Sequence, residues 1–433
     1  MKIEEIYARF RQSAGVNTDT RTLQPGQMYV ALKGENFDGN AFAMKALEAG
    51  ASFAVVNRTV PDEDPRLIKV DDTLQALKDL AALHRNVCLG EGRRLPVIGL
   101  TGTNGKTTTK ELIRTVLAAK YKVVATEGNL NNEIGVPLSV LKFGPETEIG
   151  IIEMGASHPE DLRPLLAVAQ PSHGLITNVG KAHLEGFGSF DGVKHAKGRL
   201  YDYLKEHAGT AFVNADDPVL KDMLKERDLK AVGYGVSLEG VKILPSSPRE
   251  PFLRMELDGR LIRTHLVGAY NAANVLAALR IGRYFDVPAD GAVAAIEAYI
   301  PSNNRSQLLK TERNSVIVDA YNANPSSMKV ALDNLSLVEG RKVALLGDMR
   351  ELGADSAAEH LAVVSRLEGL DAAFLVGEEF AKAAAQVKAA CPVRTFGTSA
   401  ELTAYLTEHP LEGCTVLVKG SHSTQMEKTI PAL

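Results

Sequence analysis

The chain has 433 residues, of which 45% are hydrophobic and 24% charged, as in ordinary soluble globular proteins. At about 150 residues per domain, this length predicts about three domains, each large enough to fold without disulfides. The 49 basic and 53 acidic side chains give a formal charge of −4, which argues against a nucleic-acid-binding protein.

The cysteines and the apolar segments indicate the compartment. Cys88, Cys391 and Cys414 are scattered and show no zinc-binding or CxxC spacing, so we expect reduced thiols in or near the core. Residues 1–10 lack the apolar run of a signal peptide. The sequence contains no stretch of about 18 apolar residues, so no membrane span is predicted. We therefore expect a cytoplasmic protein without membrane contact.

The first part of the chain mixes short helices and strands. Ile3, Ile6 and Phe10 recur at helical spacing. Apolar periodicity and Gly50 as a stop signal then predict a strand over 28–32, a helix over 41–49, a strand over 52–56 and a helix over 74–87. A linker is expected at residues 89–96.

The middle part opens with a buried-strand pattern over 96–100. A glycine-containing loop and a helix over 107–119 follow it. Further strands are predicted over 149–153 and 174–178, and a late helix over 266–284.

The last part alternates strands with helices. Strands are predicted over 315–319, 342–347, 372–377 and 414–419, and helices over 326–335, 357–367 and 379–389. Such alternation is typical of a doubly wound α/β sheet.

The loop between the strand at 96–100 and its helix has the chemistry of a phosphate-binding loop. Gly102 and Gly105 allow a tight turn, Lys106 would reach the β- and γ-phosphates, and the Thr107 hydroxyl would ligate Mg²⁺. The following helix would direct its free N–H groups at the anion. The strict pattern requires glycine where Leu100 stands, and an ordinary glycine turn is the alternative. The predicted nucleotide-binding residues here are Thr101, Gly102, Thr103, Asn104, Gly105, Lys106 and Thr107.

Four other side chains are candidates by position. Glu153 ends an apolar strand, where ligands bind in open α/β sheets and where a carboxylate would hold Mg²⁺. His183 follows a strand but would more often be a structural hydrogen-bonding residue. Lys197 has the sequence context of a solvated helical lysine. Asp319 ends a strand, and binding a ribose diol or capping the next helix are equally compatible with it.

The motifs together resemble those of the Mur ligases of peptidoglycan synthesis, on which cell shape and division depend. The loop at 101–107 is similar to the ATP loop of that family. Segments 128–137, 319–325 and 346–353 resemble motifs of the members that add D-alanyl-D-alanine, and 419–427 resembles a late family motif. They occur in family order along nearly the whole chain.

The resemblance implies three α/β domains. Residues 1–90 would form a small UDP-substrate-binding domain, with 17–21 and 33–39 as contact segments. Residues 96–300 would form a central P-loop-type ATPase domain with a mainly parallel sheet. Residues 301–433 would form a Rossmann-like domain that receives the dipeptide. We expect a monomer.

The resemblance also assigns roles to single residues. The implied catalytic residues are Lys106, Glu153, His183 and Lys197. The implied ligands of two Mg²⁺ ions are Thr107, Glu153, His183 and Lys197. Carbamylation of Lys197 would turn a cation into an anion beside them. The implied ATP contacts further along the chain are Asn271, Asn274, Arg305 and Asp319. The implied substrate contacts are Thr18, Asp19, Arg21, Lys33, Asp38, Asn40, Asn131, Asn132, Tyr321, Asn322 and Asp348. The chain departs from the family's usual residues at Asn40, Arg199, Tyr270 and His422.

The reaction implied is an ATP-dependent ligation. ATP would phosphorylate the carboxylate of UDP-N-acetylmuramoyl-tripeptide, and D-alanyl-D-alanine would attack the acyl phosphate. Three alternatives remain at this point: a Mur ligase that adds the third stem-peptide residue, a P-loop kinase of small molecules, and a non-enzymatic nucleotide switch. The third stem residue, diaminopimelate or lysine, does not follow from the sequence.

Overall fold

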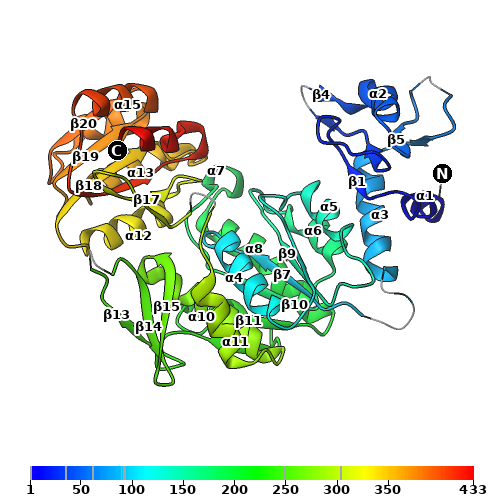
Figure 1. Ribbon diagram of the computed structural model, residues 1–433, viewed down its shortest axis with the longest axis horizontal. Coiled ribbons are helices and arrows are strands. Elements are labelled where there is room, and N and C mark those ends of the chain that lie inside the picture. Colours follow the sequence, from blue (N-terminus) through cyan, green and yellow to red (C-terminus); the bar gives the residue numbers. More distant parts are fainter. Residues whose placement is uncertain are drawn as a thin grey trace.

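The protein consists of three α/β parts, each built on its own parallel or mainly parallel sheet (Figure 1). The computed structural model describes residues 2–34, 37–60, 63–88, 90, 94–247, 250–302 and 305–433. Residues 89 and 91–93 of the expected linker, and 35 and 36 of the expected UDP-contact segment, lie outside them. No described helix combines the length and the hydrophobicity that a membrane crossing requires. Cys88, Cys391 and Cys414 are buried and form no disulfide with one another, as expected.

The N-terminal part has a four-stranded parallel sheet in the order β1-β2-β5-β6. Helix α2 covers one face, and α1 and α3 cover the other through apolar residues such as Ile6, Phe10 and Leu77. The elements are α1 (Ile3–Phe10), β1 (Val16–Asn17), β2 (Met28–Val30), β3 (Lys33–Gly34), β4 (Phe37–Asp38), η1 (Gly39–Phe42), α2 (Ala43–Glu48), β5 (Phe53–Asn57), β6 (Leu67–Val70) and α3 (Thr73–Val87).

The central part has a six-stranded parallel sheet in the order β12-β11-β10-β7-β9-β8. Helices α5, α6 and α8 pack on one face, and α4, α10 and α11 on the other. Its elements up to β12 are β7 (Val97–Thr101), α4 (Lys106–Ala118), β8 (Val123–Ala125), α5 (Gly135–Val140), β9 (Ile149–Glu153), α6 (Leu162–Ala169), β10 (His173–Ile176), α7 (Leu184–Phe187), α8 (Phe190–Glu206), β11 (Thr210–Asn214), α9 (Pro218–Lys225) and β12 (Ala231–Tyr234).

A three-stranded antiparallel sheet follows, which the sequence patterns did not reveal. It consists of β13 (Lys242–Leu244), β14 (Phe252–Leu257) and β15 (Arg260–Val267), and it precedes η2 (Ala269–Asn271), α10 (Ala272–Tyr284) and α11 (Ala289–Ala298). The helix predicted over 266–284 is therefore wrong in its first turns. Leu266 and Val267 belong to β15, and Gly268, with φ of +94°, separates the strand from the helix.

The C-terminal part has a six-stranded sheet in the order β16-β17-β21-β18-β19-β20, parallel except for β16. The predicted alternation is confirmed, although α13 and α14 end three residues earlier than predicted. The elements are β16 (Gln307–Lys310), β17 (Ser315–Asp319), α12 (Pro325–Ser336), β18 (Arg341–Gly347), η3 (Gly353–Asp355), α13 (Ser356–Val364), β19 (Ala372–Val376), α14 (Glu378–Gln386), β20 (Val393–Phe396), α15 (Ser399–Glu408), β21 (Cys414–Lys419), η4 (His422–Thr424) and η5 (Met426–Ala432).

Helix α3 joins the N-terminal part firmly to the central part. Its apolar residues belong to the same buried cluster as those of α5 and α6. His84 Nε2 lies 2.7 Å from the Phe143 carbonyl, and Arg85 donates to the carbonyl groups of Ala169 and Gln170 at the end of α6. Figure 1 shows the N-terminal and C-terminal parts at opposite ends of the central part.

Candidate active site

The phosphate-loop motif lies at the carboxyl end of β7, between β7 and α4. Its backbone needs glycine at two positions. Gly102 has φ of +145°, and a Cβ there would lie 1.9 Å from Thr177 Oγ1. Gly105 has φ of +77° and precedes α4. No described side chain caps this helix. The N–H groups of its first turn can therefore donate hydrogen bonds to an anion bound at the loop.

The segment that follows β10 holds the phosphate loop in place. Asn178 Oδ1 accepts from the Asn104 N–H, and its Nδ2 donates to the Asn104 carbonyl, both at 3.0 Å. Thr103 Oγ1 accepts from the Gly180 N–H at 2.9 Å. Strands β10, β7 and β9 are neighbours in the sheet, so their three loops meet at one edge. The open-sheet rule for ligand binding predicts a site at this edge.

Lys106 lies over the loop that precedes it. Its Nζ donates to the Gly102 and Thr103 carbonyls at 2.9 and 3.1 Å. Burial lowers the pKa of Lys106, Glu153 opposes this effect, and Arg305 adds to it. Burial has removed water from the Lys106 ammonium group. Negatively charged phosphate oxygens bound there would compensate for this loss by accepting its hydrogen bonds.

Glu153 is the carboxylate nearest to the phosphate loop. It ends β9, is 1% exposed, and accepts hydrogen bonds from Thr107 Oγ1 at 3.0 Å and Asn131 Nδ2 at 2.9 Å. Among the described residues, no lysine or arginine forms an ion pair with it. A buried carboxylate beside a threonine hydroxyl, without a paired cation, is a donor set that suits Mg²⁺.

His183 is held by the C-terminal part of the chain. It has φ of +52°, precedes α7, and its Nδ1 contacts a carboxylate oxygen of Glu351. Burial lowers the pKa of His183, the Glu351 charge opposes this, and the charges of Lys106 and Lys197 lower it further. His183 therefore lies within electrostatic reach of both lysines.

Lys197 is not a solvated helical lysine, so the interpretation of this residue from its sequence context alone was wrong. It is 2% exposed within α8, and its Nζ lies 5.7 Å from the centre of the Phe187 ring. Burial, together with the charge of Lys106, lowers its pKa well below the ordinary value for lysine. A neutral amine, rather than an ammonium ion, is the reactive form of such a side chain.

The predicted metal ligands contact different partners in this structure. Thr107 and Glu153 are hydrogen-bonded, whereas His183 contacts Glu351 and Lys197 contacts Phe187. Among the described residues, no group of three or more His, Cys, Asp or Glu side chains is arranged to hold a metal ion.

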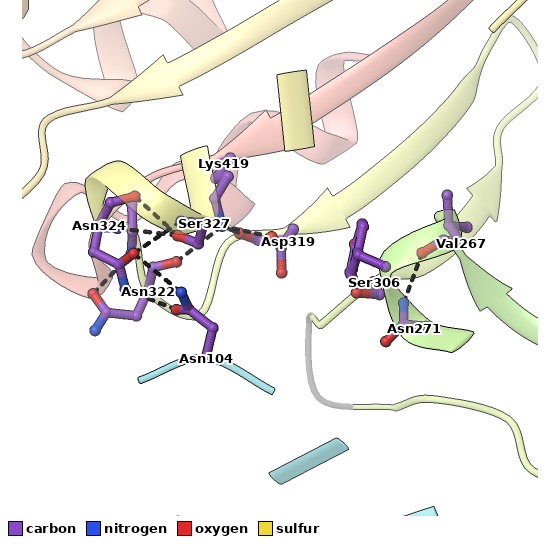
Figure 2. A network of polar contacts seen from close by, with 11 residues as sticks. Asn104, Val267, Asn271, Ser306, Asp319, Asn322, Asn324, Ser327 and Lys419 are labelled. Atoms are coloured by element: carbon purple, nitrogen blue, oxygen red, sulfur yellow. Dashed lines mark hydrogen bonds and ion pairs between the residues drawn. The ribbon is translucent and has the colours of Figure 1, made fainter. Parts of the chain in front are cut away.

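Two of the predicted ATP contacts, Asn271 and Asn274, belong to a relay of hydrogen bonds. Thr109 Oγ1 in α4 donates to Asn274, Asn274 Nδ2 donates to Asn271, and Asn271 Nδ2 donates to the Val267 carbonyl. Figure 2 shows the last of these bonds, near Ser306. The relay fixes both amide groups at the cavity wall, and Tyr270 joins the same wall by a 2.9 Å bond to Ser306.

Asp319 and Arg305 lie on the C-terminal side. Asp319 does not cap the next helix, because Asn324 does so. Instead, Asp319 Oδ2 accepts from Lys419 Nζ at 2.5 Å, and Lys419 is 1% exposed. The Arg305 guanidinium lies 3.7 Å from the centre of the Tyr321 ring.

A cavity of about 960 Å³ connects these groups. The phosphate loop, Glu153 and the segment 129–133 line it from the central part, and the segments 305–306 and 319–330 line it from the C-terminal part. The predicted residues that line it are Thr103, Asn104, Gly105, Lys106, Asn131, Asn132, Glu153, His183, Asn271, Asn274, Arg305, Asp319, Tyr321 and Asn322.

The other predicted residues lie elsewhere. Thr101, Gly102, Thr107 and Lys197 lie beneath the cavity wall and do not line it. Asp348 is buried, and its carboxylate accepts from the backbone N–H groups of Glu379 and Phe380 at the start of α14. The expected UDP contacts belong to the N-terminal part, away from this cavity: Thr18, Asp19, Arg21, Lys33, Asp38 and Asn40.

Several cavity residues were not found by sequence reasoning. Three of them, Asn178, Asn324 and Ser326, line the cavity and form hydrogen bonds with the loops around it. Two more are Glu351, which contacts His183, and Lys419, which contacts Asp319. Asn324, Glu351 and Lys419 lie inside motifs that the sequence analysis identified, and only their partners were unknown. Asn178 is the last residue of the strand predicted over 174–178, and this position at a strand end was a usable signal.

Comparison with known proteins gives a consistent result for all three parts. The family description "Mur ligase family, catalytic domain" matches residues 12–85, "Mur ligase middle domain" matches 100–282, and "Mur ligase, glutamate ligase domain" matches 304–422.

Two relatives of similar length have the same name. The UDP-N-acetylmuramoyl-tripeptide–D-alanyl-D-alanine ligase of Bacillus subtilis (strain 168) is 34% identical, over 97% of this chain and 93% of that protein. The enzyme of that name from Escherichia coli (strain K12) is 34% identical, over 96% and 93%.

Solved structures agree with this result. A crystal structure of MurF from Acinetobacter baumannii has a TM-score of 0.84 at 27% identity and covers 99% of this chain and 98% of its own. The MurF ligase of Thermotoga maritima, in complex with ADP, has a TM-score of 0.83 at 27% identity, with 97% of each chain covered.

The fold and the site define a three-domain α/β enzyme with a cavity at one edge of its central parallel sheet, and this cavity faces the Rossmann-like C-terminal domain. The chain belongs to the Mur ligase family.

Proposed function

We propose that this ligase joins D-alanyl-D-alanine to UDP-N-acetylmuramoyl-tripeptide at the expense of ATP, in the synthesis of peptidoglycan precursors. The observation that carries the proposal is the 34% identity along nearly the whole chain to enzymes of that name. The cavity supports it, because one continuous space runs from the phosphate loop to the C-terminal part. We further propose that the enzyme acts as a cytoplasmic monomer.

The chemistry has two steps. In the first, a carboxylate oxygen of the tripeptide attacks the γ-phosphorus of ATP, the bond to the bridging oxygen breaks, and ADP leaves. In the second, the amine of the dipeptide attacks the acyl carbon, phosphate leaves, and the amine loses a proton. Each step needs its reactants aligned and the acyl phosphate protected from water.

The residues of the phosphate loop would contribute charge and orientation to the first step. Lys106 would leave its carbonyl partners to contact the transferred phosphoryl group, whose charge its ammonium would stabilise. The N–H groups at the start of α4 would bind the other phosphate oxygens. Asp319, already oriented by Lys419, would accept from the ribose hydroxyls.

The donor set around Glu153 fits Mg²⁺. Glu153 and Thr107 would hold it, and bound there it would neutralise charge on the phosphates. His183 would need to leave Glu351 to join them, and a second ion would need a further anion.

A carbamylated Lys197 would supply that anion. The neutral side chain that burial favours is the form that attacks CO₂. As the N–C bond forms, one C=O π bond of CO₂ breaks and its electron pair goes to oxygen, and the nitrogen releases one proton to solvent. The product would be an anionic carbamate, which the nearby Lys106 charge would stabilise. We propose this modification for the active enzyme.

Phosphate release under defined substrates tests the proposed function. The enzyme is incubated with ATP, Mg²⁺ and UDP-N-acetylmuramoyl-tripeptide carrying either lysine or diaminopimelate, with and without D-alanyl-D-alanine. We expect sustained phosphate release only with both peptide substrates, and an amide product. A ligase that adds the third residue would instead use the dipeptide precursor and one amino acid. A kinase would transfer phosphate to a stable product.

A further inference from the structure

The first turn of α12, from the C-terminal domain, touches the phosphate loop directly. Asn324 Nδ2 donates to Asn104 Oδ1 at 2.8 Å, and Asn104 Nδ2 donates to Asn324 Oδ1 at 3.3 Å (Figure 2). The two asparagines are 220 residues apart in the chain, and Asn324 is 8% exposed. This reciprocal amide pair is a bond between two domains at the ATP site.

The orientation of the Asn324 amide is determined by its own helix. Asn324 is the N-cap of α12, and its Oδ1 accepts from the Ser327 N–H at 2.9 Å. Turning the amide over would place an NH₂ group against that N–H. Its Nδ2 must therefore face the phosphate loop, and Asn104 must present its oxygen to it.

A second contact from the same turn reaches the phosphate loop indirectly. Ser326 Oγ accepts from the Lys181 N–H at 3.0 Å. The neighbouring Gly180 is bonded to Thr103 of the phosphate loop, and a Cβ at Gly180 would lie 2.7 Å from Ser326 Oγ. The two domains therefore approach at a distance that only glycine allows.

The segment that carries Asn324 is braced from behind. The buried Lys419 at the end of β21 donates to Asp319 Oδ2 at 2.5 Å and to the Asn322 carbonyl at 3.2 Å (Figure 2). Asp319 is the last residue of β17, and Asn322 belongs to the short connection between β17 and α12. The connection, and with it Asn324, is therefore tied to the central strands of the C-terminal sheet.

We propose that Asn324 is a positioning residue, which through Asn104 makes the shape of the phosphate loop depend on the docked C-terminal domain. This goes beyond the proposed function, because it gives the start of α12 a part in ATP binding that requires neither peptide substrate. ATP then binds most tightly when the two domains are in contact.

A double-mutant cycle on the full-length enzyme tests the proposal. Asn324→Ser keeps a good N-cap for α12 but is too short to reach Asn104. Asn104→Ala removes the other partner. We expect each single variant to weaken ATP binding, measured by calorimetry with Mg²⁺ and no peptide substrate, by about fivefold, as expected for one ordinary hydrogen-bonding pair. The double variant should bind ATP no more weakly than either single one, since both changes remove the same contact.

Two further variants separate positioning from general damage. Gly180→Ala should weaken ATP binding to a similar extent, because its Cβ would displace Ser326. Lys329→Ala changes an exposed residue of the same helix that forms an ion pair with Asp333 on the helix surface, and this variant should bind ATP like the wild type. Thermal unfolding should be alike for all variants.

Additive losses in the double variant, or single variants that bind ATP like the wild type, would overturn the proposal. Failure of the wild-type enzyme to join the peptide substrates would instead count against the proposed function alone, because the cycle measures only ATP binding.

Discussion

The stacking of Arg305 on Tyr321 gives a quantitative prediction about the ATP site. The guanidinium carbon lies 3.7 Å from the ring centre, close enough for a full cation–π contact, and Arg305 Nε is buried with no hydrogen-bond partner among the described residues. The ring is therefore a main support of this arginine, which lines the cavity on the C-terminal side.

Removing the ring should cost the strength of that contact. A partly desolvated cation–π pair contributes about 1–2 kcal/mol, so Tyr321→Leu should lower kcat/KM for ATP by about five- to thirtyfold. Tyr321→Phe keeps the ring and should stay within about twofold of the wild type.

Steady-state phosphate release at varied ATP, with both peptide substrates saturating, measures the effect. Equal losses in Tyr321→Leu and Tyr321→Phe would show that the hydroxyl group matters and not the ring, and would refute the reasoning. A wild-type value for Tyr321→Leu would do the same.

Two other variants test separate parts of the site, and a third tests the stability contribution of a histidine outside it. Lys106→Ala should lower kcat by at least about a hundredfold, since it removes the cation nearest to the phosphates; phosphate release at the wild-type rate would reject the ATP assignment. Lys197→Ala should be inactive and partly restored by short carboxylic acids that replace the carbamate, whereas full activity without them would reject the modification. Burial lowers the pKa of His173 to about 4, so the unfolded chain binds more protons below about pH 6.5 and stability should fall as the pH drops from about 6.5 to about 4. The thermal midpoint of His173→Phe should fall less than that of the wild type between pH 7 and pH 5, and equal shifts would contradict this account.

Much of the fold could be predicted because local patterns determined it. The strands at 149–153, 315–319 and 414–419 were predicted to the residue, since each is a short apolar run between polar loops. The antiparallel sheet of β13, β14 and β15 was missed because charged side chains, such as Arg254 and Glu256 in β14, interrupt its apolar residues, so no continuous apolar run marks these strands. Its last residues, before Gly268, then looked like the start of a helix.

The site divides in the same way. The phosphate loop and Glu153 were predictable, since both follow strand-end rules that need no distant partner. The burial of Lys197 was not predictable, because it depends on how α8 packs against α7. The Asn104–Asn324 pair connects two domains. Its two residues are 220 positions apart in the sequence, so no local pattern predicts that contact.

Transfer of an oxygen isotope tests the central claim most directly. The tripeptide is prepared with ¹⁸O in its terminal carboxylate and incubated with ATP, Mg²⁺ and D-alanyl-D-alanine. If the carboxylate attacks the γ-phosphorus and the amine then displaces phosphate, one ¹⁸O atom must appear in the released phosphate for each amide formed. Amide formation with unlabelled phosphate would contradict the acyl-phosphate route, and labelled tripeptide recovered unchanged beside ADP would contradict the ligase assignment.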